Sequence, residues 1–121
     1  MTDIATGRFR PRRSWLGPAL VVLAVTPIVV ATIRTLARGW VVAGDNGLLL
    51  LRSQDVGTGN HPLLGTWTSA SLTAGRQISN PGPLWFDVLS PFYRLAGPSV
   101  GFAIGVMVAN VAAIVLAARR R

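Results

Sequence analysis

The chain has 121 residues, half of them hydrophobic, and carries a formal net charge of +8. Every basic side chain is arginine and every acidic one is aspartate. The absence of cysteine excludes a disulfide and a thiolate-bound metal. Two uncharged apolar runs take up so much of the chain that little is left for an independent soluble core.

The first apolar run extends from Trp15 to Ile33 and the second from Pro98 to Ala118. Each is long enough as a helix to cross a hydrocarbon core of roughly 30 Å, and in lipid a single segment satisfies its own backbone only as a helix. The sequence therefore predicts an all-α membrane protein. Its two transmembrane helices, residues 15–38 and 98–118, are joined by an external loop, residues 39–97, that contains two interfacial helices.

A cleaved signal peptide is the alternative for the first run, because a basic segment precedes it. The run is longer than the apolar part of a typical signal peptide, and it ends in Ile33 and Arg34 rather than in small residues. We therefore expect a retained span. Pro27 removes a backbone hydrogen bond within it and predicts a kink, with Thr26 or a neighbouring helix compensating.

Arginines gather at the outer ends of the two runs. They are Arg8, Arg10, Arg12 and Arg13 before the first run, and Arg119, Arg120 and Arg121 after the second. The positive-inside rule places such ends in the cytoplasm. We expect a cytoplasmic tail at residues 1–14, a cytoplasmic end at residues 119–121 and a location in the plasma (inner) membrane, although Arg34 and Arg38 reduce the asymmetry. This distribution favours the lipid bilayer as partner, and not the nucleic acid that a basic chain can also indicate.

The segment from Gly44 to Gly47 breaks the apolar pattern after the first run. Asp45 or Asn46 can cap a helix there, since a side-chain oxygen accepts the first backbone N–H groups. Four consecutive leucines with polar neighbours follow, and they predict a short helix at residues 48–56 that lies on the membrane surface.

Residues 57–83 are rich in Gly, Thr, Ser, Asn and Pro, and form either an ordered functional loop or a mobile one. Apolar and aromatic residues return after Pro83, which suits the start of a helix. We expect a second interfacial helix there, kinked or divided at Pro91. It leads into the last span at Gly97-Pro98.

A small residue recurs at every fourth position of the second run. The series is Gly97, Gly101, Gly105, Ala109, Ala113 and Ala117. Small side chains along one stripe let another helix approach closely, so we expect the stripe to be a packing face. Asn110 is polar at membrane depth and is also expected to face protein.

Three residues are candidates for binding or chemistry. Asp45 lies just past the first span, where a carboxylate can act as a general base or bind a metal beside a lipid-linked substrate; the alternative is a capping or turn residue. His61, the only histidine, can bind a substrate phosphate or act as an acid, or is an ordinary surface residue. Asn80 opens a proline-rich turn before the aromatic helix. The chain lacks zinc-ligand spacing, a glycine-rich phosphate loop and a serine nucleophile elbow.

The order of these parts carries a resemblance to a known family. The parts are the basic tail, the first span, Gly44-Asp45-Asn46, the leucine-rich helix, the segment Pro62–Ser71, the segment Asn80–Phe86, an aromatic helix ending in Phe92–Gly97, and the second span. This order resembles the N-terminal part of the integral membrane glycosyltransferases of the GT-C superfamily. Actinobacterial members that use polyprenyl-phosphate sugars are the most similar.

The resemblance implies two helices along the membrane in the first external loop, and an Asp near its start that is commonly described as the catalytic base. By resemblance this role falls on Asp45. Asn46 stands where many members have a second acid, and Asn80 stands where His is common, so no histidine-based role is carried over to Asn80. The resemblance also allows a divalent cation as cofactor, while the sequence identifies no metal ligands.

The function implied is that of the N-terminal module of a membrane glycosyltransferase that moves a sugar from a polyprenyl-phosphate donor to an acceptor hydroxyl. Asp45 is the catalytic candidate, and His61, Asn80 and Arg52 are the substrate-binding candidates. A cation could stabilise the leaving phosphate, and the loop arginines available for this are Arg52, Arg76 and Arg94. The family's proteins are much longer, so the chain is interpreted as a fragment, a truncated product or a small relative, with further transmembrane helices as partners. The alternatives are a small non-enzymatic two-span subunit that docks a larger membrane partner, and a non-functional truncation.

Overall fold

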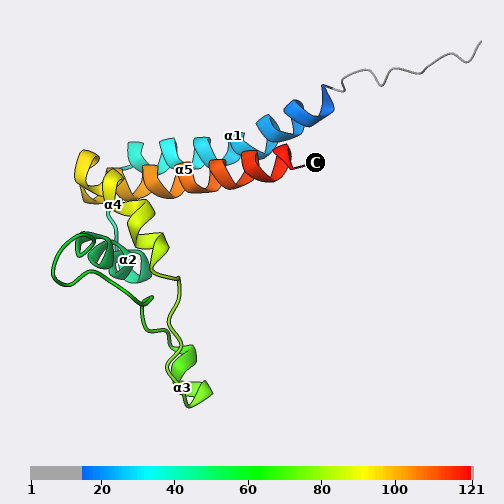
Figure 1. Cartoon of the computed structure of the whole chain (residues 1–121). Coiled ribbons are helices and arrows are strands. Elements are labelled where there is room, and N and C mark those ends of the chain that lie inside the picture. Colours follow the sequence, from blue (N-terminus) through cyan, green and yellow to red (C-terminus); the bar gives the residue numbers. More distant parts are fainter. Residues whose placement is uncertain (1–14, 121) are drawn as a thin grey trace, which may run out of the picture.

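The computed structural model describes residues 15–120 and is all-α (Figure 1). The five helices in that range are α1 (Leu16–Ala37), α2 (Gly44–Gln54), α3 (Ala70–Ala74), α4 (Leu84–Ala96) and α5 (Pro98–Arg119). The predicted all-α class is confirmed, and the two helices expected in the loop correspond to α2 and α4. The basic tail at residues 1–14 and the terminal Arg121 lie outside the described residues.

α1 and α5 lie side by side in opposite directions, so that α1 begins and α5 ends at the same end of the pair (Figure 1). Each has 22 residues, and an 18-residue stretch within each has a mean hydropathy of 2.3 in α1 and 2.4 in α5. By length and composition, both helices are long and apolar enough to cross a membrane. No residue of α1 is buried. Several of its large apolar side chains are exposed, and lipid or another protein could cover them: Leu16, Leu20, Val22, Leu23, Val30 and Ile33.

Polar side chains within the two long helices bond to their own backbone one turn earlier. The Thr26 hydroxyl donates to the Val22 carbonyl at 2.7 Å, and Asn110 Nδ2 donates to the Val106 carbonyl at 2.8 Å. Asn110 is exposed, and its amide finds a partner locally, so the expectation that it faces protein stays a prediction. α1 runs through Pro27 as one helix, and its N-terminal part bends away from α5 (Figure 1).

α4 folds back onto the beginning of α5 through a one-residue joint at Gly97. Gly97 has φ 80° and ψ 179°, a backbone region that is essentially open only to glycine. Its N–H donates to the Tyr93 carbonyl at 2.8 Å and closes α4. Pro98 then starts α5, where its missing N–H costs no helical hydrogen bond. One helix therefore ends and the next begins without an intervening loop.

The backbones of α4 and α5 come into direct contact at Gly101. A Cβ atom at Gly101 would overlap the Phe92 carbonyl oxygen, and one at Gly105 would lie 2.9 Å from Leu89 Cδ2. The small-residue stripe is thus a packing face at these two positions, but its partner is α4 of the same chain. Further along the stripe, Ala113 is exposed. Pro91 lies inside α4 without dividing it.

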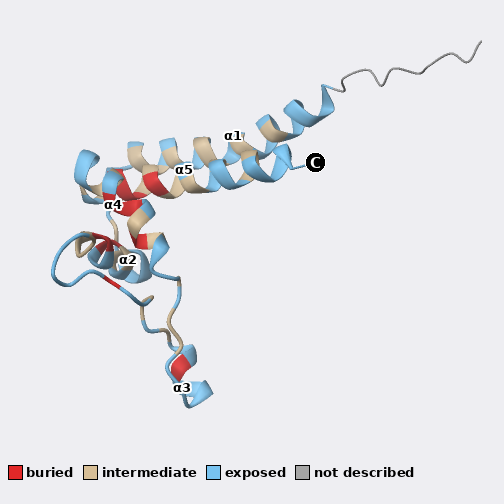
Figure 2. Ribbon diagram, in the orientation of Figure 1, coloured by how far each residue is buried: buried red, intermediate tan, exposed pale blue. Residues whose placement is uncertain are grey.

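Buried side chains gather where α2, α4 and α5 meet (Figure 2). Leu50 of α2, Leu89 of α4 and Phe102 of α5 form the centre of this core. Partly buried residues surround them: Trp40, Val42, Leu49, Trp85, Tyr93 and Val106. The Trp40 ring lies 6.4 Å from the Phe102 ring, centroid to centroid. The core therefore ties the segment between the long helices to the first turns of α5.

Replacing Gly101 by alanine should weaken the packing of α4 on α5. The added methyl group overlaps backbone atoms that cannot move without shifting a helix, and overpacking of this kind costs about 1–3 kcal/mol. Thermal unfolding of the purified protein in detergent micelles should show a lower midpoint for Gly101→Ala. Gly17→Ala in α1 is the matched control, because a Cβ there meets no atom within 4 Å. Equal midpoints for the two variants would contradict this packing.

Candidate functional site

An open depression of about 420 Å³ lies between the first turns of α2 and the segment that carries α3. Its lining residues are Asp45, Leu48, Leu49, Thr66, Trp67, Thr68, Ser69, Asn80 and Pro81. Asp45 and Asn80, which are far apart in the sequence, therefore line one depression together. The wall opposite α2 belongs to an arm, residues 66–80, whose tip is α3 (Figure 1).

Backbone hydrogen bonds close the base of this arm. The Asn80 N–H donates to the Thr66 carbonyl at 2.8 Å, and the Thr66 hydroxyl donates to the Asn80 carbonyl at 2.8 Å. The Thr68 N–H donates to the Ile78 carbonyl at 3.1 Å. Gly65 lies directly against the Pro81 carbonyl, where a side chain would not fit. The polar loop expected at residues 57–83 is thus internally hydrogen-bonded at the point where it faces α2.

Asp45 lies in the first turn of α2 and is exposed. The predicted cap at Asp45 or Asn46 is wrong: Ala43 is the N-cap residue, and no side chain caps the helix. The reason is Gly44, whose φ of +59° lets the chain enter the helix before Asp45. A carboxylate in the first turn interacts favourably with the helix dipole, by about 0.3–1 kcal/mol. At this position the Asp45 carboxylate makes no capping hydrogen bond, and the residue lines the depression.

The other lining residues are of the types that sites for polar, ring-shaped ligands contain. Thr66, Thr68 and Ser69 bring hydroxyls, and Asn80 brings an amide. Trp67 is 54% exposed, so its flat apolar face is open to a ligand. Pockets that orient small molecules combine an aromatic or apolar surface with a few polar groups. The depression has this composition, and Thr66, Thr68 and Ser69 line it together with the Asp45 carboxylate.

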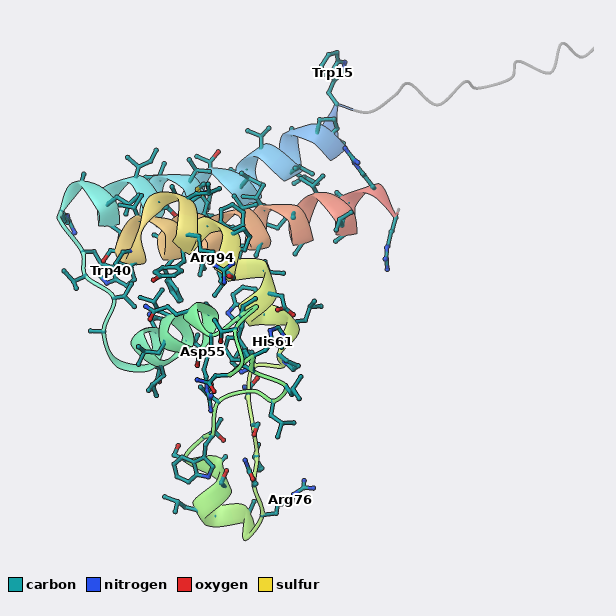
Figure 3. All side chains as sticks on the ribbon, turned by 60° about the vertical axis from the view of Figure 1, so that its left-hand side comes forward. Trp15, Trp40, Asp55, His61, Arg76 and Arg94 are labelled. Carbon is teal, nitrogen blue, oxygen red and sulfur yellow. The ribbon has the colours of Figure 1, made fainter. Side chains whose placement is uncertain are left out.

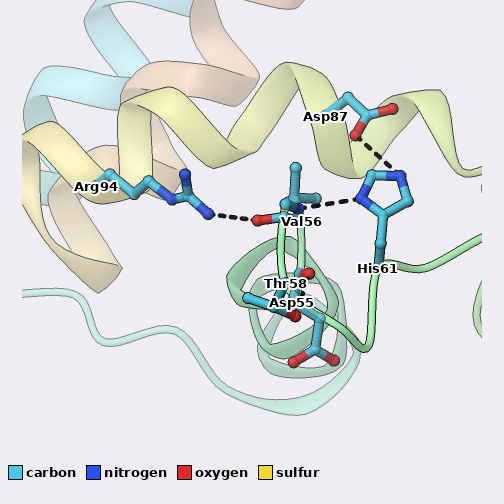
Figure 4. A network of polar contacts seen from close by, with 7 residues as sticks. Asp55, Val56, Thr58, His61, Asp87 and Arg94 are labelled. Carbon is cyan, nitrogen blue, oxygen red and sulfur yellow. Dashed lines mark hydrogen bonds and ion pairs between the residues drawn. The ribbon is translucent and has the colours of Figure 1, made fainter.

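His61 does not line this depression but connects the loop after α2 to α4 (Figure 4). The Gly57 N–H donates to His61 Nδ1 at 3.1 Å. His61 Nε2 lies 3.7 Å from Asp87 Oδ1. Both side chains are well exposed, 38% and 41%, so the contact contributes at most about 1 kcal/mol.

The loop arginines lie in three different places. Arg94 of α4 donates to the Val56 carbonyl and so binds the same loop as His61 (Figure 4). Arg52 is exposed on α2 and is not among the lining residues. Arg76 lies beside α3 at the tip of the arm (Figure 3). Of the four predicted site residues, the structure thus brings Asp45 and Asn80 together and leaves His61 and Arg52 outside the depression.

The depression contains one carboxylate, so a divalent cation bound there would need further ligands from outside the described side chains. Within residues 15–120, no group of three or more His, Cys, Asp or Glu side chains is placed to hold a metal ion. Asp45 is the one carboxylate among the residues that line the depression. Mg²⁺ and Ca²⁺ sites in proteins are built from oxygen ligands that include one or more carboxylates with further oxygen partners. The side chains at the depression are one carboxylate with neutral hydroxyl and amide groups around it.

Comparisons with known protein families, curated proteins and solved structures found no match to this chain.

Sequence reasoning missed the contribution of Trp67, Thr66 and Thr68 to the same depression as Asp45. The sequence does contain one sign of it, the alternation of Thr66, Trp67 and Thr68, which suits an extended segment with the side chains of residues 66 and 68 on one face. A single antiparallel bridge between Trp67 and Ser79 pairs this segment with the other side of the arm. The bond from Arg94 to Val56 has no sign in the sequence.

Replacing Gly65 by alanine should open the base of the arm. A Cβ at Gly65 overlaps the Pro81 carbonyl, so the bonds between Thr66 and Asn80 cannot keep their geometry. We expect the Asn80 and Thr68 amides to exchange with deuterium at least about tenfold faster, which corresponds to about 1.4 kcal/mol of opening free energy. Gly82→Ala is the control, because a Cβ there meets nothing within 4 Å. Unchanged exchange in Gly65→Ala would contradict the arm's geometry.

Proposed function

We propose that the chain is the N-terminal module of a membrane glycosyltransferase that moves a sugar from a polyprenyl-phosphate donor to an acceptor hydroxyl. The observation that carries this proposal is the shared depression of Asp45, Asn80 and Trp67, with threonine and serine hydroxyls beside them. An exposed indole can stack on the apolar face of a sugar, while an amide and hydroxyls bind its hydroxyl groups. A carboxylate at the same place can act as a general base.

The membrane arrangement that accompanies this proposal has α1 and α5 as spans of the plasma (inner) membrane. Residues 39–97 lie outside the cytoplasm and both termini lie inside. The exposed apolar side chains of α1 support the spans, and the seven arginines at the outer ends of the apolar runs support the orientation. The depression then lies outside the cytoplasm, near the membrane surface where a lipid-linked donor presents its sugar.

In the proposed reaction the acceptor hydroxyl attacks the anomeric carbon of the donor sugar. Asp45 takes the hydroxyl proton, a bond forms between the acceptor oxygen and the anomeric carbon, and the bond from that carbon to the phosphate oxygen breaks. The electron pair leaves with the polyprenyl phosphate. A cation beside the leaving phosphate would stabilise its charge. Arg52, which is exposed on the same helix as Asp45, is the loop arginine that best fits this role.

Asn80 fits a role in binding a sugar hydroxyl, because its backbone is held by Thr66 while its side chain is exposed in the depression. His61 fits a less direct role. Its two ring nitrogens face Gly57 and Asp87, so it supports the loop between α2 and the arm. A substrate phosphate would have to displace one of these contacts to bind His61.

A second function is favoured by a different observation. An apolar groove of about 380 Å³ runs between α1 and α5 and is lined mainly by valines. Apolar surfaces between membrane helices bind other helices or lipid chains. We propose as the alternative a small non-enzymatic subunit whose two spans dock a larger membrane partner. In that case the depression would have no catalytic consequence.

The proposed topology is tested by single cysteines, since the chain has none of its own. Thr73→Cys in α3 should react with a membrane-impermeant thiol reagent added outside intact cells. Thr6→Cys, at a position outside the described residues, should react only after the membrane is opened. Labelling of Thr6→Cys alone from outside would reverse the orientation, and labelling of both would show that the chain does not span the membrane as proposed.

Asp45→Asn tests the proposed base. The amide keeps the size of the side chain but removes its basicity, so sugar transfer should fall by about a hundredfold or more. The assay follows labelled sugar from a polyprenyl-phosphate donor in membranes whose only copy of this chain is the variant. Asp55→Asn is the control, because Asp55 follows α2 and does not line the depression.

The same experiment separates the two functions. Transfer that depends on Asp45 but not on Asp55 supports the enzyme module. Transfer that needs the chain but is indifferent to Asp45→Asn, at normal protein levels, supports the docking subunit. In that case Asp45 would act only as a favourable charge in the first turn of α2.

A further inference from the structure

A second polar site lies at the end of α1, away from the depression beside α2. Arg34 and Arg38 are one turn apart and both line an open hollow of about 550 Å³. Thr35 and Trp40 complete its polar and aromatic walls, and Ala31 forms the remainder. None of these residues has a part in the proposed transfer reaction.

The two guanidinium groups have no acidic partner in the part of the chain that the structure describes. The ion pair found there joins His61 to Asp87, and both arginines are exposed. Two like charges four residues apart on one helix face destabilise each other. The interaction of Arg34 with the negative end of the helix dipole accounts for one cation in the last turn, but not for a paired set around a hollow. Such a pair suits an anionic ligand, which would relieve the repulsion.

The wall of the hollow is held in place. Trp40 is half-buried and packs on Phe102 in the core where α2, α4 and α5 meet. The backbone N–H of Trp40 also donates to the Thr35 backbone carbonyl at 3.3 Å. Figure 3 shows Trp40 on the chain that leaves the end of α1. A ligand bound to the arginines would thus lie beside a fixed indole, with little reordering of the protein.

The depth of the arginines identifies the anion. The uncharged run that ends at Ile33 begins at Trp15, and at 1.5 Å per residue it spans about 28 Å, close to the thickness of a hydrocarbon core. Arg34 and Arg38 then emerge where lipid phosphates lie, with Trp40 at the depth typical of interfacial indoles. Guanidinium groups pair with phosphate oxygens through two hydrogen bonds at once.

We propose that Arg34, Arg38 and Trp40 form a binding site for the phosphate of an anionic bilayer phospholipid. The proposal rests on insertion of α1 in a membrane and is independent of sugar transfer. The phosphate pairs with the two guanidinium groups, the Thr35 hydroxyl is available to an ester oxygen, and the acyl chains lie along the exposed apolar surface of α1. The lipid would fix the depth at which α2 and the core lie above the membrane.

Native mass spectrometry of the purified chain in detergent micelles tests this site, with dioleoylphosphatidylglycerol as the probe. The wild type should retain one lipid. The Arg34→Gln, Arg38→Gln double variant should bind roughly tenfold to thirtyfold more weakly, the scale of removing two interfacial cations. Arg76→Gln is the control, because Arg76 is an exposed arginine outside the hollow; it is compared with the single variants Arg34→Gln and Arg38→Gln, which lose the same charge. Equal weakening in the three single variants would overturn the site in favour of a general effect of charge.

Four further measurements distinguish an anionic phospholipid from a different ligand of the same hollow. Arg34→Lys, Arg38→Lys keeps both charges and should retain more lipid than the glutamine pair; equal loss, with unchanged helix content by circular dichroism, would overturn a role in anion binding. Dioleoylphosphatidylcholine should bind more weakly than the anionic lipid, and equal binding would overturn the requirement for a net negative headgroup. Displacement of the lipid by inorganic phosphate at comparable concentration, or preferential binding of a polyprenyl phosphate, would overturn the assignment to a bilayer phospholipid.

Discussion

The contact between α4 and α5 at Gly101 determines where everything between the two long helices lies. Backbones can touch there because neither Gly101 nor Gly105 places a side chain between the helices. Gly97 alone separates the end of α4 from the start of α5, so the two helices stay close at this end. α4 then presents Leu89 to Leu50 of α2. α2 in turn carries Asp45 in its first turn. A displacement of α4 would therefore shift α2, and with it the position of Asp45 in the depression.

The long helices and α2 and α4 were predictable because their signals are local. The length of an uncharged run, and the return of apolar residues after Pro83, need no knowledge of distant contacts. The partner of the glycine stripe was not predictable, since an intramolecular helix and a partner helix satisfy the same pattern. The start of α2 was misplaced for a different reason. Asp45 is a good capping residue, but the chain turns at Gly44, whose φ is positive, and Asp45 already lies within the first helical turn.

Two residues of the candidate site were predictable one by one, but their convergence was not. Asp45 and Asn80 each stood out, one for its position after the apolar run and the other for its turn, with the resemblance to a family as further support. Their convergence depends on the paired hydrogen bonds between Thr66 and Asn80, which close the arm over a span of sequence that gives no periodic signal. His61 shows the converse case. Its partner Asp87 lies on another element, so the isolated histidine of the sequence belongs to a structural contact in the fold.

The charges around the depression limit what this chain can do by itself. The depression contains a carboxylate, hydroxyls and an amide, but no arginine among its lining residues. A departing polyprenyl phosphate is an anion, and its departure is helped by a nearby cation. Arg94 is bound to the Val56 carbonyl, and Arg34 and Arg38 line a separate hollow at the end of α1. If the depression is a transfer site, Arg52 must turn toward it or the cation must come from another protein element. In the second case a partner with membrane helices could supply the cation, and the exposed apolar surface of α1 offers such a partner a contact. A partner with its own transmembrane helices would both supply a cation at the depression and cover the apolar surface of α1.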